Sequence, residues 1–315
     1  MSERAKVLLR PVVDAEMDAD AAWLRASVEA FEPRLRELER RGEEAAGPGA
    51  WGSKAGERPD LGCSSSCRCC EPLFPGRPYF DLDRWAARWW NRRQGDAALC
   101  RRLAQAAAHG DPIVLGAAAD PYGGDAAHRA RTRRRLAACR ELEGAELALT
   151  TASPLVLCDL DLLVDLDRTS SLSVEIVVPT FDAALARRLE PEAAPPAERL
   201  GAVAEIAAQG IAVRLRAAPL LPGLSAGEAA LRPLLAAADR AGAVDVAASP
   251  LRLGWRARRP FLAWLAVEEP DLVPRYRALY RRRRTLPPAE RRALLADFHR
   301  LRLEHGFPHA IASRA

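Results

Sequence analysis

Four cysteines lie within the ten-residue segment GCSSSCRCCE, residues 62–71. Cys63, Cys67 and Cys70 have the spacing CX3CX2C, and Cys69 is an additional thiol directly before the third of them. Three thiolates on one short loop can each bind one iron of a cubane cluster and leave the fourth iron without a protein ligand. Cysteine is also the ligand type that iron–sulfur clusters use. The spacing therefore predicts a [4Fe-4S] cluster with one open coordination position.

Three other interpretations of this segment stay open. A zinc site would need Cys69 as its fourth ligand, but adjacent side chains diverge and would strain a tetrahedral site. Cys67 and Cys70 have the CXXC spacing of a redox dithiol, which leaves Cys63 unexplained. Incidental buried thiols are the last alternative. The other cysteines have no ligand spacing and are expected to be small core or surface residues: Cys100, Cys139 and Cys158.

Strands and helices are expected to alternate from residue 111 onward, because short apolar runs alternate with longer Ala/Leu/Arg segments. This pattern predicts βαβ units and a parallel sheet, either open or closed into a barrel. The expected strands are Pro112–Ala118, Glu146–Thr151, Leu172–Pro179, Ile211–Pro219 and Ala243–Ser249. The expected helices are His128–Leu142, Asp182–Leu189, Pro196–Gln209 and Ala226–Ala241.

Both ends of the chain are expected to be helical. Residues 14–45 have apolar side chains at three- and four-residue steps, and a Gly- and Pro-rich loop follows them. The tryptophan-rich region Arg84–Ala108 fits a helix or an early strand. Beyond Leu253 the sequence predicts helices, which the pair Pro287–Pro288 divides.

A net charge of +5 and a pI near 9.0 would ordinarily suggest a nucleic-acid partner, but the composition of this chain weakens that inference. Only Lys6 and Lys54 are lysines, so 47 − 2 = 45 of the basic residues are arginine, in a chain rich in alanine. The basic segments Arg129–Arg135 and Arg281–Arg284 therefore read as solvated helix faces, and nucleic-acid binding is not the favoured expectation. No apolar run is long enough for a membrane helix and no secretory core is seen, so we expect a cytoplasmic protein without a membrane partner.

The cysteine motif, placed ahead of alternating strands and helices, resembles the radical S-adenosylmethionine superfamily. Further segments are similar to its spore photoproduct lyase-like subgroup, and the resemblance covers roughly Gly62 to Arg259. In chain order these segments are LGAAADPY (115–122), Thr132–Arg133, SPLVLCDLDLL (153–163), Thr180–Asp182, RLEP (188–191) and APLLPGL (218–224).

This resemblance implies an α/β fold, a partial (β/α) barrel whose first strand precedes the cluster loop. It implies an N-terminal segment (1–61), a barrel core (62–255) and a C-terminal helical extension (256–315). Cys63, Cys67 and Cys70 would hold the cluster, and its open iron would chelate S-adenosylmethionine. One electron from a donor such as a flavodoxin or ferredoxin would then give a 5′-deoxyadenosyl radical, which abstracts hydrogen from a substrate that the sequence does not identify.

Two departures from the subgroup keep alternatives open. Ala152 and Val177 stand where members carry a lysine and a small hydroxyl residue that help to hold the carboxylate of S-adenosylmethionine. One alternative is therefore a diverged relative that keeps an iron–sulfur cluster as a structural or redox element without cleavage. Others are a lyase or repair-like enzyme that acts on nucleic acid, and a zinc-bound barrel that serves as an interaction module.

Charged residues interrupt two of the expected strands. Glu175 lies in the expected strand Leu172–Pro179. Arg214 and Arg216 lie in the expected strand Ile211–Pro219, and because they are two positions apart they share one face of it. These side chains either point into the barrel and bind the cofactor carboxylate or a substrate anion, or form a structural ion pair or lie at an exposed strand end.

Three further residues are candidates for cofactor binding: Asp120, Tyr122 and Ser153. Asp120 and Tyr122 follow an expected strand at its carboxyl end, where barrel active sites are built. Ordinary Asp-Pro turn chemistry is the alternative for that pair.

Overall fold

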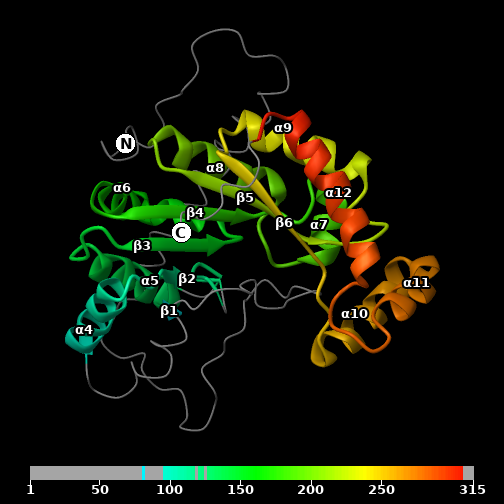
Figure 1. Cartoon of the computed structure of the whole chain (residues 1–315), viewed down its shortest axis with the longest axis horizontal. Coiled ribbons are helices and arrows are strands. Elements are labelled where there is room, and N and C mark those ends of the chain that lie inside the picture. Colours follow the sequence, from blue (N-terminus) through cyan, green and yellow to red (C-terminus); the bar gives the residue numbers. More distant parts are fainter. Residues whose placement is uncertain (1–79, 82–94, 118–119, 124–125, 308–315) are drawn as a thin grey trace.

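A six-stranded parallel sheet forms the centre of the computed structural model, which describes residues 80–81, 95–117, 120–123 and 126–307 (Figure 1). The strands lie side by side in chain order. They are β1 (Phe80–Asp81), β2 (Ile113–Leu115), β3 (Glu146–Thr151), β4 (Ser171–Val177), β5 (Val213–Leu220) and β6 (Asp245–Pro250). The expected parallel α/β sheet is confirmed. The cysteine segment and the expected helix at 14–45 lie outside the described residues, as does any strand before the cysteines.

Helices connect the strands and continue beyond them. They are α4 (Gly95–Ala108), α5 (Ala126–Cys139), α6 (Leu160–Thr169), α7 (Ala183–Leu189), α8 (Pro196–Ala208), α9 (Glu228–Arg240), α10 (Trp255–Glu268), α11 (Val273–Leu279) and α12 (Pro288–Glu304). Two 3-10 helices, η2 (Pro154–Asp159) and η3 (Pro270–Leu272), complete the set. The proline pair divides the C-terminal helices as expected, because Pro288 begins α12. No described helix has the length and apolar character needed to cross a membrane.

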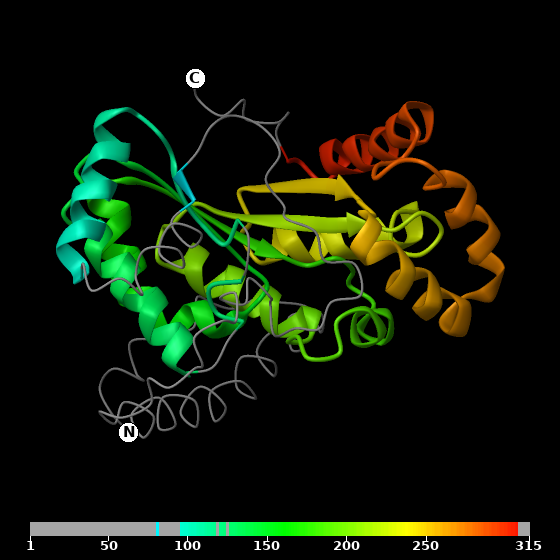
Figure 2. The same cartoon turned by 90° about the horizontal axis from the view of Figure 1, so that it is seen from below.

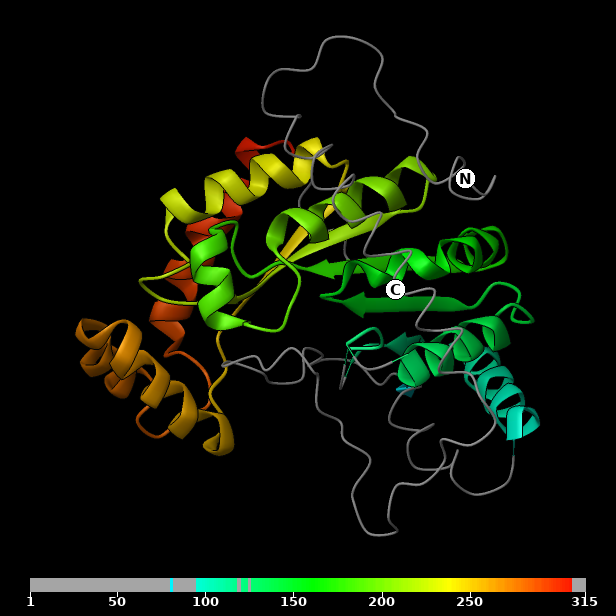
Figure 3. The ribbon, with the colours of Figure 1, turned by 180° about the vertical axis from the view of Figure 1, so that it is seen from behind.

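The sequential strand order places the connecting helices on one face of the sheet. Parallel crossovers are right-handed, so a sheet wound in a single direction carries its helices on one side and curls toward the other, as a partial barrel does. Figure 3 shows α5, α6, α8 and α9 in front of the strands, and Figure 1 shows the strands from the opposite side. We call the side away from these helices the inner face.

The main apolar core lies between the sheet and its helices. On β4, Leu172, Val174 and Ile176 belong to this core, so the alternate side chains of the strand, including Glu175, point to the inner face. On β5, Val213 and Leu215 belong to the same core, so Arg214 and Arg216 also point to the inner face.

A second apolar cluster lies at the carboxyl end of the sheet. It joins α7, α10 and α11 to the segments after β5 and β6, with Phe261 and Tyr276 in ring contact at 5.4 Å. Figure 2 shows α10 and α11, in orange, beyond the arrowheads of the strands. In contrast, α12 contributes Phe298 and Leu301 to the main core.

Candidate functional site

Polar side chains of four neighbouring strands meet on the inner face. Glu175 on β4 accepts hydrogen bonds from the Arg216 guanidinium on β5 and, at 3.4 Å, from the Thr150 hydroxyl on β3. Arg216 also donates to the Ser249 hydroxyl on β6 at 3.3 Å. We call these residues and Arg214 the inner-face cluster. An ion pair between Glu175 and Arg216, one of the alternatives from the sequence, is thus present.

The inner-face cluster has more positive than negative charge. Arg214 pairs in register with Glu175, yet its half-buried side chain forms no hydrogen bond or ion pair with the described residues. The Glu175 carboxylate, which is 8% exposed, pairs with Arg216. The other register partner of Arg214, Asp245 on β6, pairs with Arg302 on α12. A partly desolvated excess cation favours the binding of an anion.

Strand register aligns Arg216 with both departures from the subgroup. Val177 on β4 is the direct partner of Arg216, and Ala152 continues the row beyond the pair Thr151 and Ile176. The positions that lack the expected lysine and hydroxyl thus neighbour an arginine on the next strand.

Asp120 ties the loop after β2 to the end of β3. Its carboxylate accepts hydrogen bonds from the Thr151 hydroxyl at 2.6 Å, the Ala152 N–H at 2.7 Å and the Tyr122 N–H at 2.9 Å. Burial raises the pKa of Asp120 above its usual range, and these hydrogen bonds act in the opposite direction. The structure thus gives Asp120 a positioning role at the carboxyl end of the sheet.

Gly116 allows the same loop to pass close to β3. Its φ is +86°, and a Cβ at this position would lie 1.9 Å from the carbonyl oxygen of Thr150. Only glycine fits this close approach of two backbones.

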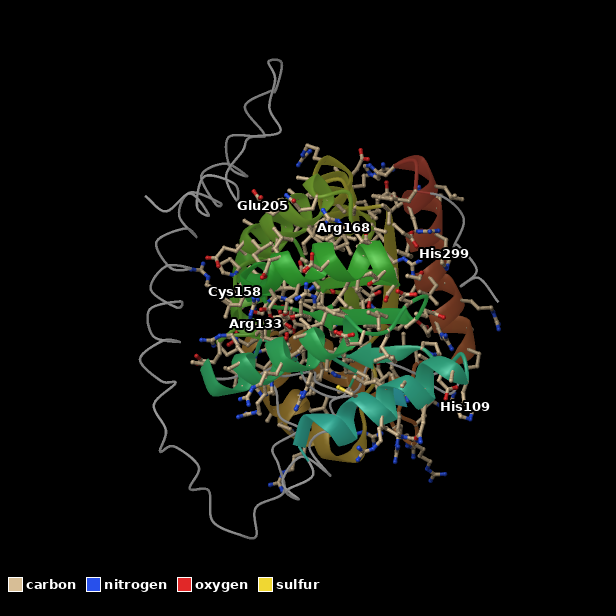
Figure 4. The ribbon with its side chains drawn as sticks, turned by 90° about the vertical axis from the view of Figure 1, so that its left-hand side faces the viewer. His109, Arg133, Cys158, Arg168, Glu205 and His299 are labelled. Carbon is tan, nitrogen blue, oxygen red and sulfur yellow. The ribbon has the colours of Figure 1, made fainter. Side chains whose placement is uncertain are left out.

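Tyr122 is buried and points away from the inner-face cluster toward the η2 segment. Its hydroxyl donates to Asp159 at 2.9 Å, and Asp159 also pairs with Arg133 at 2.7 Å. Burial, followed by the nearby Asp159, raises the pKa of Tyr122 well above its usual value. Figure 4 shows Arg133 beside Cys158, whose carbonyl oxygen accepts from the guanidinium at 3.4 Å. This network anchors α5 to η2.

Ser153 begins the 3-10 helix η2. Its hydroxyl accepts a hydrogen bond from the Leu155 N–H at 3.3 Å, and its own N–H donates to Thr151 at 3.0 Å. The side chain is an N-cap, which satisfies a donor that the helix leaves unpaired. Asp120, Tyr122 and Ser153 thus take part in hydrogen bonds at the carboxyl ends of β2 and β3, and their role in cofactor binding stays a prediction.

Arg199 on α8 was missed by the sequence analysis. Its side chain is 1% exposed and donates to Glu190 at 2.6 Å, the Val177 carbonyl at 3.0 Å and the Ala194 carbonyl at 2.8 Å. It fixes the end of β4 against the segment RLEP. The available signal was an arginine within the apolar stripe of an otherwise ordinary helix.

The three cysteines proposed as ligands have the right donor chemistry for a cluster, but they lie outside the described residues. Within the described ranges no group of three or more His, Cys, Asp or Glu residues could hold a metal ion. Burial raises the pKa of Cys139 to about 12, which agrees with an inert core thiol.

Two uncharacterized proteins, from Mycobacterium tuberculosis and Mycobacterium bovis, are relatives of this chain. Each is 31% identical to it over 240 residues, which cover 74% of this chain and 69% of the relative. No family model matches the sequence.

A solved structure shares the fold. Spore photoproduct lyase complexed with dinucleoside spore photoproduct has a TM-score of 0.51 at 13% identity, over 77% of this chain and 71% of that chain. At such low identity the likeness concerns the arrangement of the strands and helices.

Proposed function

We propose that this chain, which belongs to the family of these uncharacterized mycobacterial proteins and has the partial-barrel fold of the radical S-adenosylmethionine superfamily, cleaves S-adenosylmethionine reductively. It binds a [4Fe-4S] cluster through Cys63, Cys67 and Cys70. The observation that carries the proposal is a CX3CX2C segment ahead of a sequential parallel sheet with a charged inner face.

When bound, the cluster supplies the electron that splits the sulfonium of S-adenosylmethionine into methionine and a 5′-deoxyadenosyl radical, which abstracts hydrogen from the substrate. The chain itself contributes binding and orientation. Asp120 and Ser153 shape the loops at the carboxyl end of β2 and β3.

Arg214 and Arg216 support a binding role for the inner-face cluster. A guanidinium can hold a carboxylate through two parallel hydrogen bonds, and this pair has one cation in excess of Glu175. The two arginines bind the carboxylate of S-adenosylmethionine and take the role of the lysine that Ala152 replaces.

Anaerobic reconstitution tests the proposed chemistry. The protein should take up iron and sulfide, show a cluster signal by electron paramagnetic resonance on reduction, and form 5′-deoxyadenosine when S-adenosylmethionine and dithionite are added. Cys63→Ala should lose the cluster, whereas Cys100→Ala is the matched control and should retain it. A cluster that forms without production of 5′-deoxyadenosine would favour a diverged relative that does not cleave S-adenosylmethionine, in agreement with the departures at Ala152 and Val177. Stoichiometric zinc without iron would favour a zinc-bound interaction module.

Substitution tests the carboxylate site separately. Arg214→Met and Arg216→Met should each weaken S-adenosylmethionine binding by roughly tenfold, because a charge-assisted hydrogen bond contributes about 1.5–3 kcal/mol. Glu175→Gln should preserve or strengthen binding, since it removes the competing carboxylate. Unchanged affinity in both arginine variants, measured by titration of the reconstituted protein, would leave the pair with a structural role only.

A further inference from the structure

Four consecutive arginines, Arg281–Arg284, form an exposed loop between α11 and α12. The backbone of the loop is held from beneath. Arg258 on α10 donates to the carbonyl of Arg281 at 3.2 Å and to that of Arg283 at 2.8 Å, and the Leu253 N–H donates to the carbonyl of Arg284 at 2.8 Å. Because the carbonyls face α10, the loop has a fixed conformation from which its guanidinium groups extend into solvent.

These guanidinium groups form no ion pair with the part of the chain that the structure describes. Some other arginines have acidic partners, as Arg232 and Arg300 do with Glu228. No Asp or Glu occurs in residues 272–289, which also include exposed Arg277 and Arg275, and Arg275 pairs with Glu290 at 4.0 Å. Single exposed arginines occur on other helices, but a run of four arginines occurs once in the sequence, in this loop.

The loop lies at the functional end of the barrel. Leu253, which binds it, follows the carboxyl end of β6 by three residues. α10, which binds the loop, and α11, which precedes it, lie beyond the arrowheads of the strands in Figure 2. Reactions in parallel barrels take place at this end of the sheet.

We propose that the Arg281–Arg284 loop, with Arg275 and Arg277, is the docking surface for a small acidic protein that delivers one electron to this chain. This inference rests on the proposed function, because reductive cleavage consumes one electron that the chain does not itself generate. The carrier loses one electron and is oxidised, and the iron–sulfur cluster of this chain is reduced by one electron.

A protein carrier fits this surface better than a nucleic acid does. Further along α10 from Arg258, Leu262 and Trp264 are half-exposed at the edge of the second apolar cluster, and Val267, nine residues on, is 80% exposed. Apolar and aromatic side chains next to arginines are typical of protein interfaces. Contacts to a phosphate backbone need charge alone, and the two tyrosines of α11 and its end, Tyr276 and Tyr280, are buried and offer no stacking surface for single-stranded bases.

Binding of a bacterial flavodoxin to the reconstituted full chain tests the docking surface. The variant Arg281→Gln/Arg282→Gln/Arg283→Gln/Arg284→Gln should bind about tenfold more weakly at low ionic strength and show a weaker dependence on salt. The matched control is Arg101→Gln/Arg134→Gln/Arg187→Gln/Arg240→Gln, which removes the same charge from exposed positions on four other helices. The control should bind like the unchanged protein.

Dithionite separates docking from chemistry, because this small reductant needs no docking surface. The loop variant should lose flavodoxin-supported formation of 5′-deoxyadenosine and keep the dithionite-supported reaction. No reaction with dithionite in the unchanged protein would contradict the proposed function, whereas the affinity measurement still tests the docking surface. Equal weakening in both quadruple variants would overturn the proposal, as would loss of duplex DNA binding in the loop variant without any loss of flavodoxin binding.

Discussion

Asp120 illustrates how a single carboxylate can organise the end of a sheet. Its three hydrogen bonds reach two segments, the loop after β2 and the end of β3. The sequence indicated the strand end and the Asp-Pro turn. It did not indicate the hydrogen bonds from Thr151 and Ala152, because these residues lie about thirty positions away in the chain. The same limit applies to Arg216: the strand pattern showed which face it shares with Arg214, and only the register showed that Glu175 binds it.

Asp120→Asn should destabilise the protein by about 1–3 kcal/mol, because an amide nitrogen would face a donor that the carboxylate now satisfies. Burial raises the pKa of Asp120 above its ordinary value of 3.8. A carboxyl group whose pKa is higher in the folded state binds more protons when folded, so its contribution to the free energy of unfolding falls as pH rises from near 4 through the folded pKa. The difference in stability between the unchanged protein and the variant should therefore narrow above pH 4, as urea unfolding across a pH series would show. A difference that widens with pH would contradict the direction of the shift.

At the scale of elements, the strands were predictable because their apolar runs are short and rich in β-branched residues. The expected strand Glu146–Thr151 coincides with β3, and the other expected strands overlap β2, β4, β5 and β6 with ends that differ by a few residues. The helix α6 was missed: its sequence LDLLVDLDRT alternates leucine and aspartate, a period of two that resembles a strand. Burial of Leu162, Leu163 and Leu166 against the core overrides that local pattern.

Arg199 connects three elements, and its removal should be costly. Arg199→Met leaves Glu190 buried without its cation, and the expected loss is about 3–5 kcal/mol of unfolding free energy. Arg199→Lys keeps the charge and should lose less. The double variant Arg199→Met/Glu190→Met should recover part of the loss, because no unpaired charge remains. Chemical denaturation of the unchanged protein, Arg199→Met, Glu190→Met and the double variant measures the coupling, and additive single effects would show that the pair is not an energetic unit.

At the scale of the whole molecule, two apolar clusters divide the C-terminal region. The resemblance implied a boundary at residue 255, which stays a prediction. Beyond it, α10 and α11 cover the carboxyl end of the sheet, while α12 returns to the main core beside β6 and α9. A return of this kind has no local signal, since an amphipathic helix does not encode which surface it will cover.

Truncation tests whether the C-terminal region is an appendage or part of the barrel. A chain of residues 1–254 lacks Phe298, Leu301 and Phe307 from the main core and also lacks the helices of the second cluster. Loss of three large buried side chains costs several kcal/mol, comparable to the total stability of a domain. We expect this fragment to bind a hydrophobic dye and to lose its near-ultraviolet circular dichroism and cooperative thermal transition. A chain of residues 1–307 is the control and should unfold like the full chain, because it keeps both clusters. A sharp, native-like transition in the shorter fragment would show instead that residues 62–254 fold independently.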